Sequence, residues 1–273
     1  MAIGRLPKME GPAAIVSQVV EEMLSELKWS RAPTGFISPS SLAKGCIHYL
    51  ARELLGMPRE DFDTRVKKIL EVGTAGHARI PRYFSKITMA REVPFVDYEY
   101  RIKGKCDAII YIPPTMDLVN SGFYVVEIKT TSSSEFEQIM EAGEPKEEHV
   151  SQCHIYIWGI TRYYQNFPIK GGIIYYENRD SLVHYLFNVE YDEERMKKLL
   201  NQVKEVWKYV EEKRLPEPNV PVGHWACEYC PYKFSCDVGL KTMELKKNTT
   251  PDWVIAKAIA KRIVLKKRSQ VNT

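Results

Sequence analysis

The stretch FYVVEIKTTSS, residues 123–133, begins as an apolar strand and ends in charged and polar side chains. Because side chains alternate along a strand, Glu127 and Lys129 project to the same side. Two unlike charges near a core are costly unless they pair or serve chemistry. One explanation is a structural salt bridge, and the other is a catalytic pair. The residues around this strand distinguish the two.

A second carboxylate precedes this strand. The stretch GKCDAIIY, residues 104–111, places Asp107 at the start of an apolar strand immediately before the strand that carries Glu127. Adjacent strands bring the two carboxylates close, where they repel unless a cation lies between them. Mg²⁺ and Mn²⁺ take such oxygen ligands and keep positions for water and phosphate. The pattern predicts a metal site in which Lys129 orients or helps deprotonate a water.

The surrounding pattern predicts an α/β domain. Helical spacing predicts a helix over 12–28, a second from an N-cap at Ser38 to about Leu55, and a third over 61–86, continuous or broken near its glycines. Two strands are expected within 91–112 around a turn at Lys103–Gly104. Further expected elements are strands at 123–130, 171–177 and 182–190, and helices at 148–160 and 192–214.

These residues resemble the PD-(D/E)XK nuclease superfamily. Glu127-Ile128-Lys129 matches its (D/E)-x-K element and Gly104-x-x-Asp107 its preceding Asp motif, although Cys106 stands where the eponymous Pro would be. Gly73-x-x-x-His77 matches the His that RecB-type members place ahead of the Asp motif. Gln152-x-x-x-Tyr156, preceded by His149, matches their Gln-x-x-x-Tyr motif, and a four-residue spacing puts both side chains on one helical face.

The resemblance implies a restriction-endonuclease-like fold, a mixed sheet flanked by helices with an iron–sulfur cluster subdomain. It implies Mg²⁺ or Mn²⁺ held by His77, Asp107, Glu127 and the Ile128 carbonyl, with Lys129 as the catalytic amine. Gln152 and Tyr156 are the implied substrate-binding residues. Arg79, Arg82, Lys86 and Arg91 follow His77 and either lead a DNA backbone toward the metal or form a solvated helix face.

The six cysteines fall into two groups. Cys106 and Cys153 are flanked by apolar residues and are interpreted as packing residues. Cys227-x2-Cys230-x5-Cys236 has metal-ligand spacing and needs a fourth ligand. Composition leaves two candidates: His224, which would give a Cys₃His zinc site, and Cys46, which would complete four thiolates for an iron–sulfur cluster.

The same cysteine pattern resembles the iron–sulfur RecB-type nucleases, which include AddB-type nuclease domains and the CRISPR-associated Cas-four exonucleases. The match rests on Cys46 after a Ser-x-Ser-x-Leu lead, the three later cysteines, and an aromatic at Tyr232. It implies a [4Fe–4S] cluster held by Cys46, Cys227, Cys230 and Cys236 that joins the two ends of the domain.

Charge and hydropathy place the chain in solution. No apolar run is long enough to span a bilayer, and the N-terminus lacks a signal-peptide apolar region, so a cytoplasmic location is expected, that of the host cell if the chain is viral. The net charge is +4, but residues 241–273 carry nine Lys/Arg and two acids, a net +7. This basic tail either attracts phosphate or is a solvated terminus.

We therefore divide the chain into an N-terminal accessory helix (1–35), a RecB-like nuclease domain (36–214), a cysteine cluster segment (215–240) and a basic C-terminal tail (241–273). The predicted function is a metal-dependent deoxyribonuclease that acts as an exonuclease on single-stranded ends, with endonuclease activity as an open alternative, in CRISPR adaptation or in viral or mobile-element recombination and replication. The predicted partners are DNA and proteins of those pathways. The alternatives are a non-catalytic DNA-end-binding scaffold, a partner-dependent subunit of a helicase–nuclease complex, and a zinc-stapled binding module.

Overall fold

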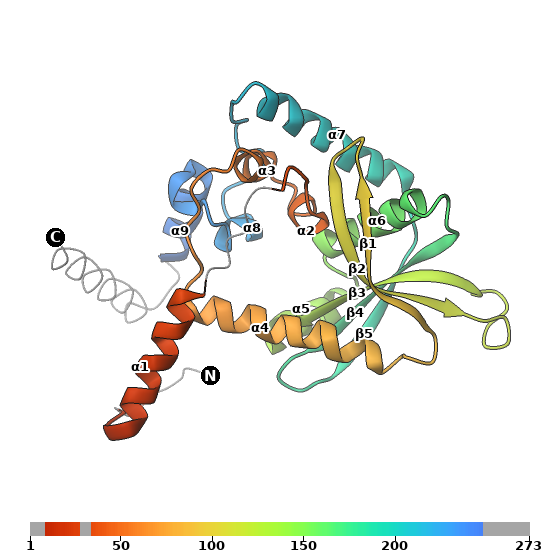
Figure 1. Ribbon diagram of the computed structural model, residues 1–273, viewed down its shortest axis with the longest axis horizontal. Helices are drawn as coiled ribbons and strands as arrows, with labels where there is room; N and C mark the ends of the chain where they lie inside the picture. The colour runs from red at the N-terminus through yellow and green to blue at the C-terminus, as the bar shows by residue number, and fades with distance from the viewer. Residues whose placement is uncertain (1–8, 28–33, 248–273) are drawn as a thin grey trace.

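The computed structural model describes residues 9–27 and 34–247 (Figure 1). Most of the basic tail and part of the predicted accessory segment lie outside the described residues. Five strands form one mixed sheet in the order β1-β2-β3-β4-β5, in which β3 is central, antiparallel to β2 and parallel to β4. The strands are β1 Thr88–Asp97, β2 Ile102–Ile112, β3 Gly122–Thr131, β4 Ile169–Asn178 and β5 His184–Val189.

Helices flank this sheet, so the predicted α/β architecture is confirmed. The parallel pairing of β3 with β4 requires a crossover connection, and α5 and α6 provide it. In Figure 1 the sheet lies at one end of the molecule, and α1, α8 and α9 lie at the other. The helices are α1 Gly11–Glu26, α2 Pro39–Leu42, α3 Ile47–Leu54, α4 Thr64–Arg79, η1 Ile80–Arg82, α5 Ser133–Ala142, α6 Glu147–Tyr163, α7 Glu193–Glu211, α8 Trp225–Glu228, η2 Lys233–Ser235 and α9 Asp237–Lys247.

Two hydrophobic clusters cover the two faces of the sheet. The larger contains residues of α3, α6 and α7 together with Val125 and Ile174 of the central strands. The smaller lies under the end of α4 and η1 and contains Ile80, Val126 and Ile128. Residues 125 and 126 therefore face opposite sides, as alternation requires, and Glu127 and Lys129 lie on the α6 side of β3. Among the described residues, none of the helices has the length and apolar character needed to cross a membrane.

The structure corrects the predicted helix from Ser38 to Leu55. Ser38 is the N-cap as expected, because its hydroxyl accepts a hydrogen bond from Ser41 N–H at 3.2 Å. The helix nevertheless ends at Leu42, because Gly45 adopts φ +69°, and Cys46 caps a separate helix, α3. Cys46 thus lies at the start of a helix rather than inside one.

The predicted turn at Lys103–Gly104 is also wrong, because the turn occupies residues 98–101. Gly104 lies within the ladder and pairs with Phe95. A Cβ at Gly104 would lie 2.5 Å from Pro39 Cγ, so this glycine permits a close approach rather than a turn. The third helix, α4, runs unbroken through Gly73 and Gly76, and α5 was not predicted.

Candidate active site

The predicted site lies where the pairing of β2 with β3 ends. The outermost registered pair at this end is Ala108 of β2 with Val126 of β3, and Asp107 is the residue that precedes Ala108. Its neighbours face opposite sides, because Cys106 belongs to the larger core cluster and Ala108 to the smaller. Strand alternation is therefore interrupted at Asp107. Its carboxylate accepts from the main-chain N–H of Ile128, with 2.7 Å between Oδ2 and N.

Helix α4 brings His77 to the other oxygen of Asp107. His77 Nδ1 and Asp107 Oδ1 are 2.8 Å apart. This approach depends on Gly76, because a Cβ there would lie 2.6 Å from Thr130 Cγ2 on β3. Burial lowers the pKa of His77, but the hydrogen bond and charge of Asp107 outweigh it, so the pKa is raised above its ordinary value.

Glu127 and Lys129 form an ion pair on the α6 side of β3, with 2.5 Å between Lys129 Nζ and Glu127 Oε1. Glu127 is 1% exposed, and apart from the Lys129 ammonium neither of its oxygens has a hydrogen-bond partner. Burial raises the pKa of this carboxyl to about 7, Lys129 opposes the shift and Asp107 adds to it. A buried carboxylate left with so few partners is unusual in a purely structural role.

Lys129 is also held from α6. Its ammonium donates to Gln152 Oε1 at 3.0 Å, and Gln152 Nε2 donates to the Tyr156 hydroxyl at 2.9 Å. Gln152 and Tyr156 are both buried, and burial raises the pKa of Tyr156 well above its ordinary value. The two residues predicted to bind substrate therefore lie behind Lys129, where they orient its ammonium.

Two further pairs around the site were not predicted. His149 Nδ1 lies 2.6 Å from the hydroxyl of Tyr176, which pairs with Lys129 across β3 and β4. Arg79 of α4 forms an ion pair with Glu177 of β4, which is 2% exposed. Arg79 is thus anchored to the sheet. The polar pair Glu177-Asn178, which ends the apolar strand β4, marks Glu177 as an unusual residue in the sequence, but nothing in the sequence identifies Arg79 as its partner.

The donor set fits a divalent cation that prefers oxygen ligands. Asp107, Glu127 and the Ile128 carbonyl supply oxygens, His77 supplies a nitrogen, and the buried oxygens of Glu127 have no hydrogen-bond partner besides the Lys129 ammonium. As the side chains stand, His77 pairs with Asp107 and Glu127 with Lys129. Across residues 9–27 and 34–247, no group of three or more His, Cys, Asp or Glu side chains is arranged to hold a metal ion.

The four predicted cluster cysteines, Cys46, Cys227, Cys230 and Cys236, line one small cavity. All four are free thiols. Burial raises the pKa of Cys46 to about 11, and the charges of the other three cysteines add to the shift. The structure thus brings the four cysteines to one cavity, but among the described residues their side chains are not arranged to hold a metal ion.

Side-chain contacts hold α3 against the cysteine segment at this cavity. Arg52 of α3 donates to the Ser235 hydroxyl at 2.9 Å and to the Ser235 carbonyl at 2.6 Å. Asn219 Oδ1 accepts from Ile47 N–H at 2.9 Å. His224 is not among the residues that line the cavity; its Nδ1 accepts from Ala226 N–H, and it lines a separate hollow with Trp225.

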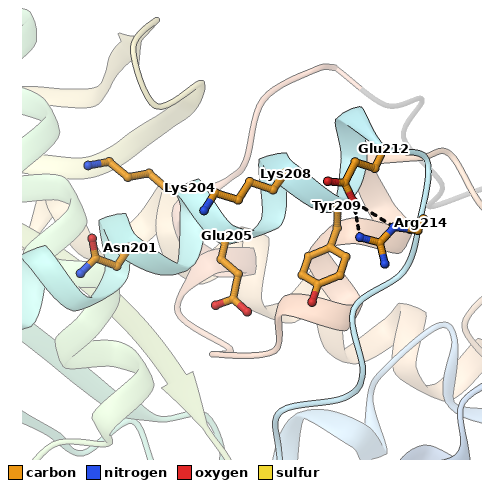
Figure 2. Close-up of a pocket in the computed structure, with 7 residues that line it drawn as sticks. All are labelled: Asn201, Lys204, Glu205, Lys208, Tyr209, Glu212 and Arg214. Carbon is orange, nitrogen blue, oxygen red and sulfur yellow. Dashed lines mark hydrogen bonds and ion pairs between the residues drawn. The ribbon is translucent and has the colours of Figure 1, made fainter.

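A hollow on α7 lies apart from these residues (Figure 2). It is lined by Lys204, Lys208 and Tyr209, and by Arg214, which pairs with Glu212. None of the predicted site residues lines it, so it is not the candidate active site.

The sequence profile of the PD-(D/E)XK nuclease superfamily matches residues 8–237. The chain therefore belongs to this superfamily of nucleases. No curated protein sequence matches it significantly.

Solved structures are similar at low identity. The crystal structure of SSO0001 is 20% identical, with a TM-score of 0.47 over 83% of this chain and 95% of that one. The alkaline exonuclease LHK-Exo from Laribacter hongkongensis is 14% identical, with a TM-score of 0.47 over 67% and 91%. A phage-related exonuclease from Haemophilus somnus 129PT is 13% identical, with a TM-score of 0.41 over 70% and 97%.

Proposed function

We propose that this nuclease is a Mg²⁺- or Mn²⁺-dependent deoxyribonuclease that acts as an exonuclease on single-stranded DNA ends. The observation that carries the proposal is the meeting of side chains from four elements at one end of β3. His77 of α4 contacts Asp107 of β2. On β3, Glu127 forms an ion pair with Lys129, and Lys129 donates a hydrogen bond to Gln152 of α6. Superfamily membership supplies the reaction class, phosphodiester hydrolysis.

His77, Asp107, Glu127 and the Ile128 carbonyl would hold the cation in this proposal. Such a cation polarises the scissile phosphate and lowers the pKa of a bound water. Glu127 is suited to this task because the Lys129 ammonium is the only partner of its buried oxygens among the described residues. The Asp107 carboxylate is held in position by two hydrogen bonds, one from Ile128 N–H to Oδ2 and one between His77 and Oδ1.

Lys129 is the proposed catalytic amine. Its side chain is 21% exposed, so Lys129 is partly accessible while Glu127 and Gln152 restrict the position of its ammonium. An amine held in this way orients the attacking water and offsets the negative charge that develops on the phosphate. Tyr156 positions Lys129 indirectly, because its hydroxyl fixes the Gln152 amide, which in turn holds the Lys129 ammonium.

We further propose that Cys46, Cys227, Cys230 and Cys236 hold a [4Fe–4S] cluster. The gathering of these four residues around one cavity supports this assignment, and the position of His224 on a different hollow speaks against a Cys₃His zinc site. The cluster would join α3 to the cysteine segment, which already meet through Arg52 and Ser235. On the resemblance, the proposed role is CRISPR adaptation or viral or mobile-element recombination and replication.

The test uses protein purified without oxygen or chelator, with end-labelled single- and double-stranded DNA in Mn²⁺, Mg²⁺ or EDTA. Lys129→Ala removes the amine and keeps the proposed ligands, and Lys197→Ala, an exposed lysine of α7 paired with glutamates, is the matched control. We expect metal-dependent degradation by the parent and the control alone. The label at each end gives the polarity. Cleavage by Lys129→Ala at the parent rate would disprove the site, and DNA binding without cleavage by the parent would indicate a scaffold.

A further inference from the structure

Helix α1 presents an apolar face to solvent. Six of its apolar side chains, or of those adjoining it, are between 41% and 65% exposed. Their spacing of one, three and four residues puts them on one side of the helix. The side chains are Ile15, Val16, Val19, Val20, Met23 and Leu27. A contiguous apolar face of this kind marks an interaction surface more often than a solvated one.

Contacts with α4 fix the orientation of this face. Leu24 is the buried residue of α1, and Lys67 of α4, itself 1% exposed, donates to the Leu24 carbonyl at 2.9 Å. Glu21 accepts from Thr64 Oγ1 at 2.7 Å and pairs with Lys68. Lys67 of α4 therefore holds the C-terminal end of α1, and Glu21 holds α1 to Thr64 and Lys68. The apolar face of α1 is directed away from these contacts, because its side chains are exposed.

The surface around this face is acidic. Glu10, Glu21, Glu22 and Glu26 belong to α1 or adjoin it, and the sequence from Met9 to Leu27 contains no lysine, arginine or histidine. A second α1 packed on the first would bring these glutamates together, which is unfavourable. The occupant that complements the face is therefore an apolar segment that carries positive charge.

The C-terminal sequence of the chain has this chemistry. Ile255, Ile259 and Ile263 recur every four residues, the spacing that aligns side chains on one helical face. Residues 248–273 contain six Lys/Arg and one acid, a net charge of +5.

We propose that the C-terminal segment 252–268 covers the apolar face of α1 in the same molecule. The segment follows α9, and α9 and α1 lie at the same end of the molecule, remote from the sheet (Figure 1). At 1.5 Å per residue, seventeen residues in helical form span about 25 Å, which matches the 16 residues of α1. The proposal does not depend on the nuclease activity proposed above.

Hydrogen exchange of the full-length protein tests this contact. We expect amides of 252–268 to exchange at least about tenfold more slowly than an unstructured segment. Val16→Ser with Val19→Ser should abolish that protection, because both side chains are exposed and Ser and Val have similar helix propensities. Val119→Ser, at a 79% exposed valine in the loop between β2 and β3, is the matched control and should leave the protection unchanged. Protection should also weaken as salt screens the charges.

Carboxyl–amine cross-linking of mixed isotope-labelled and unlabelled protein identifies the occupant. Links between Glu22 or Glu26 and Lys257 or Lys261 within one isotopic form support the proposal. Links that combine the two isotopic forms would show a second copy as the occupant and overturn it. Fast exchange of 252–268 in the parent, or protection that appears only when DNA or anionic vesicles are added, would also overturn it.

Discussion

The carboxylate of Asp107 accepts a hydrogen bond from the main-chain N–H of Ile128, with 2.7 Å between the two atoms. Regular pairing of β2 with β3 ends at Ala108 and Val126, two residues before Ile128, so a side-chain oxygen is the partner of this main-chain donor. The contact fixes Asp107 against Glu127-Ile128-Lys129, and its second oxygen remains directed to His77. The backbone of the sheet thus sets where the Asp107 carboxylate lies relative to the Glu127 carboxylate.

Asp107→Asn tests this arrangement, because the amide oxygen still accepts from Ile128 N–H while one charge is lost. We expect the free energy of unfolding of the metal-free protein to change by less than about 1 kcal/mol. Mn²⁺ affinity, measured by titration calorimetry, should fall at least about tenfold. Asp117→Asn, in the loop between β2 and β3, is the control. Parent-like Mn²⁺ affinity in Asp107→Asn would remove Asp107 from the site.

Gln152→Leu tests whether the buried amide positions Lys129. The variant keeps the side-chain volume and removes the acceptor 3.0 Å from Lys129 Nζ. Because a hydrogen bond to a charged group contributes about 1.5–3 kcal/mol, we expect kcat to fall about 10- to 100-fold. The Lys129→Ala,Gln152→Leu double variant should be no slower than Lys129→Ala. Strictly additive losses in this cycle would assign Gln152 a separate role.

We expect substitution of Arg79 to lower the free energy of unfolding more than substitution of its partner Glu177. Arg79→Ala leaves the Glu177 carboxylate 2% exposed and without its cation, which costs about 3 kcal/mol or more. Glu177→Gln leaves Arg79, whose side chain is 39% exposed and reaches water, so the loss should be smaller, about 1 kcal/mol. Urea unfolding measures both values. A larger loss for Glu177→Gln would mean that Glu177 acts through other contacts.

His149 predicts a dependence of stability on pH. Burial, together with the charges of Lys129 and Lys146, lowers its pKa well below 6.5. The folded state therefore binds fewer protons than the unfolded state just below pH 6.5, and stability should fall as the pH drops through this range. His149→Gln retains a partner for the Tyr176 hydroxyl and removes the titration.

The measurement is the free energy of unfolding of parent and variant from pH 7.5 to 5. The difference between them isolates His149 from His154, whose pKa is also lowered, and from His77, whose pKa is raised. The difference should change by at most about 1.4 kcal/mol per pH unit, in the direction of relative stabilisation of His149→Gln in acid. A difference that is constant with pH would show that His149 keeps an ordinary pKa.

The sequence predicted much of the central sheet and the meeting of the site residues, because strand alternation and helical spacing are local properties. Glu127 and Lys129 share a face for this reason. Gly45 and Gly104 could not be interpreted in the same way, because a glycine is equally compatible with a turn and with a close approach. Gly104 is explained by Pro39, which is distant in sequence. The contact of Arg79 with Glu177 joins residues 98 apart and has no local signature.

The two cysteine assignments make opposite predictions for Cys46 and His224. If Cys46 completes a four-thiolate set, Cys46→Ala should lose the visible absorbance and the iron of anaerobically purified protein, while His224→Ala keeps both. Cys153→Ala, in the core of the nuclease domain, controls for the loss of a buried thiol. Colourless parent protein that contains one zinc, lost in His224→Ala and kept in Cys46→Ala, would establish the zinc site instead. Loss of the cluster should also lower the melting temperature, because four ligands from 46 to 236 no longer join α3 to the cysteine segment.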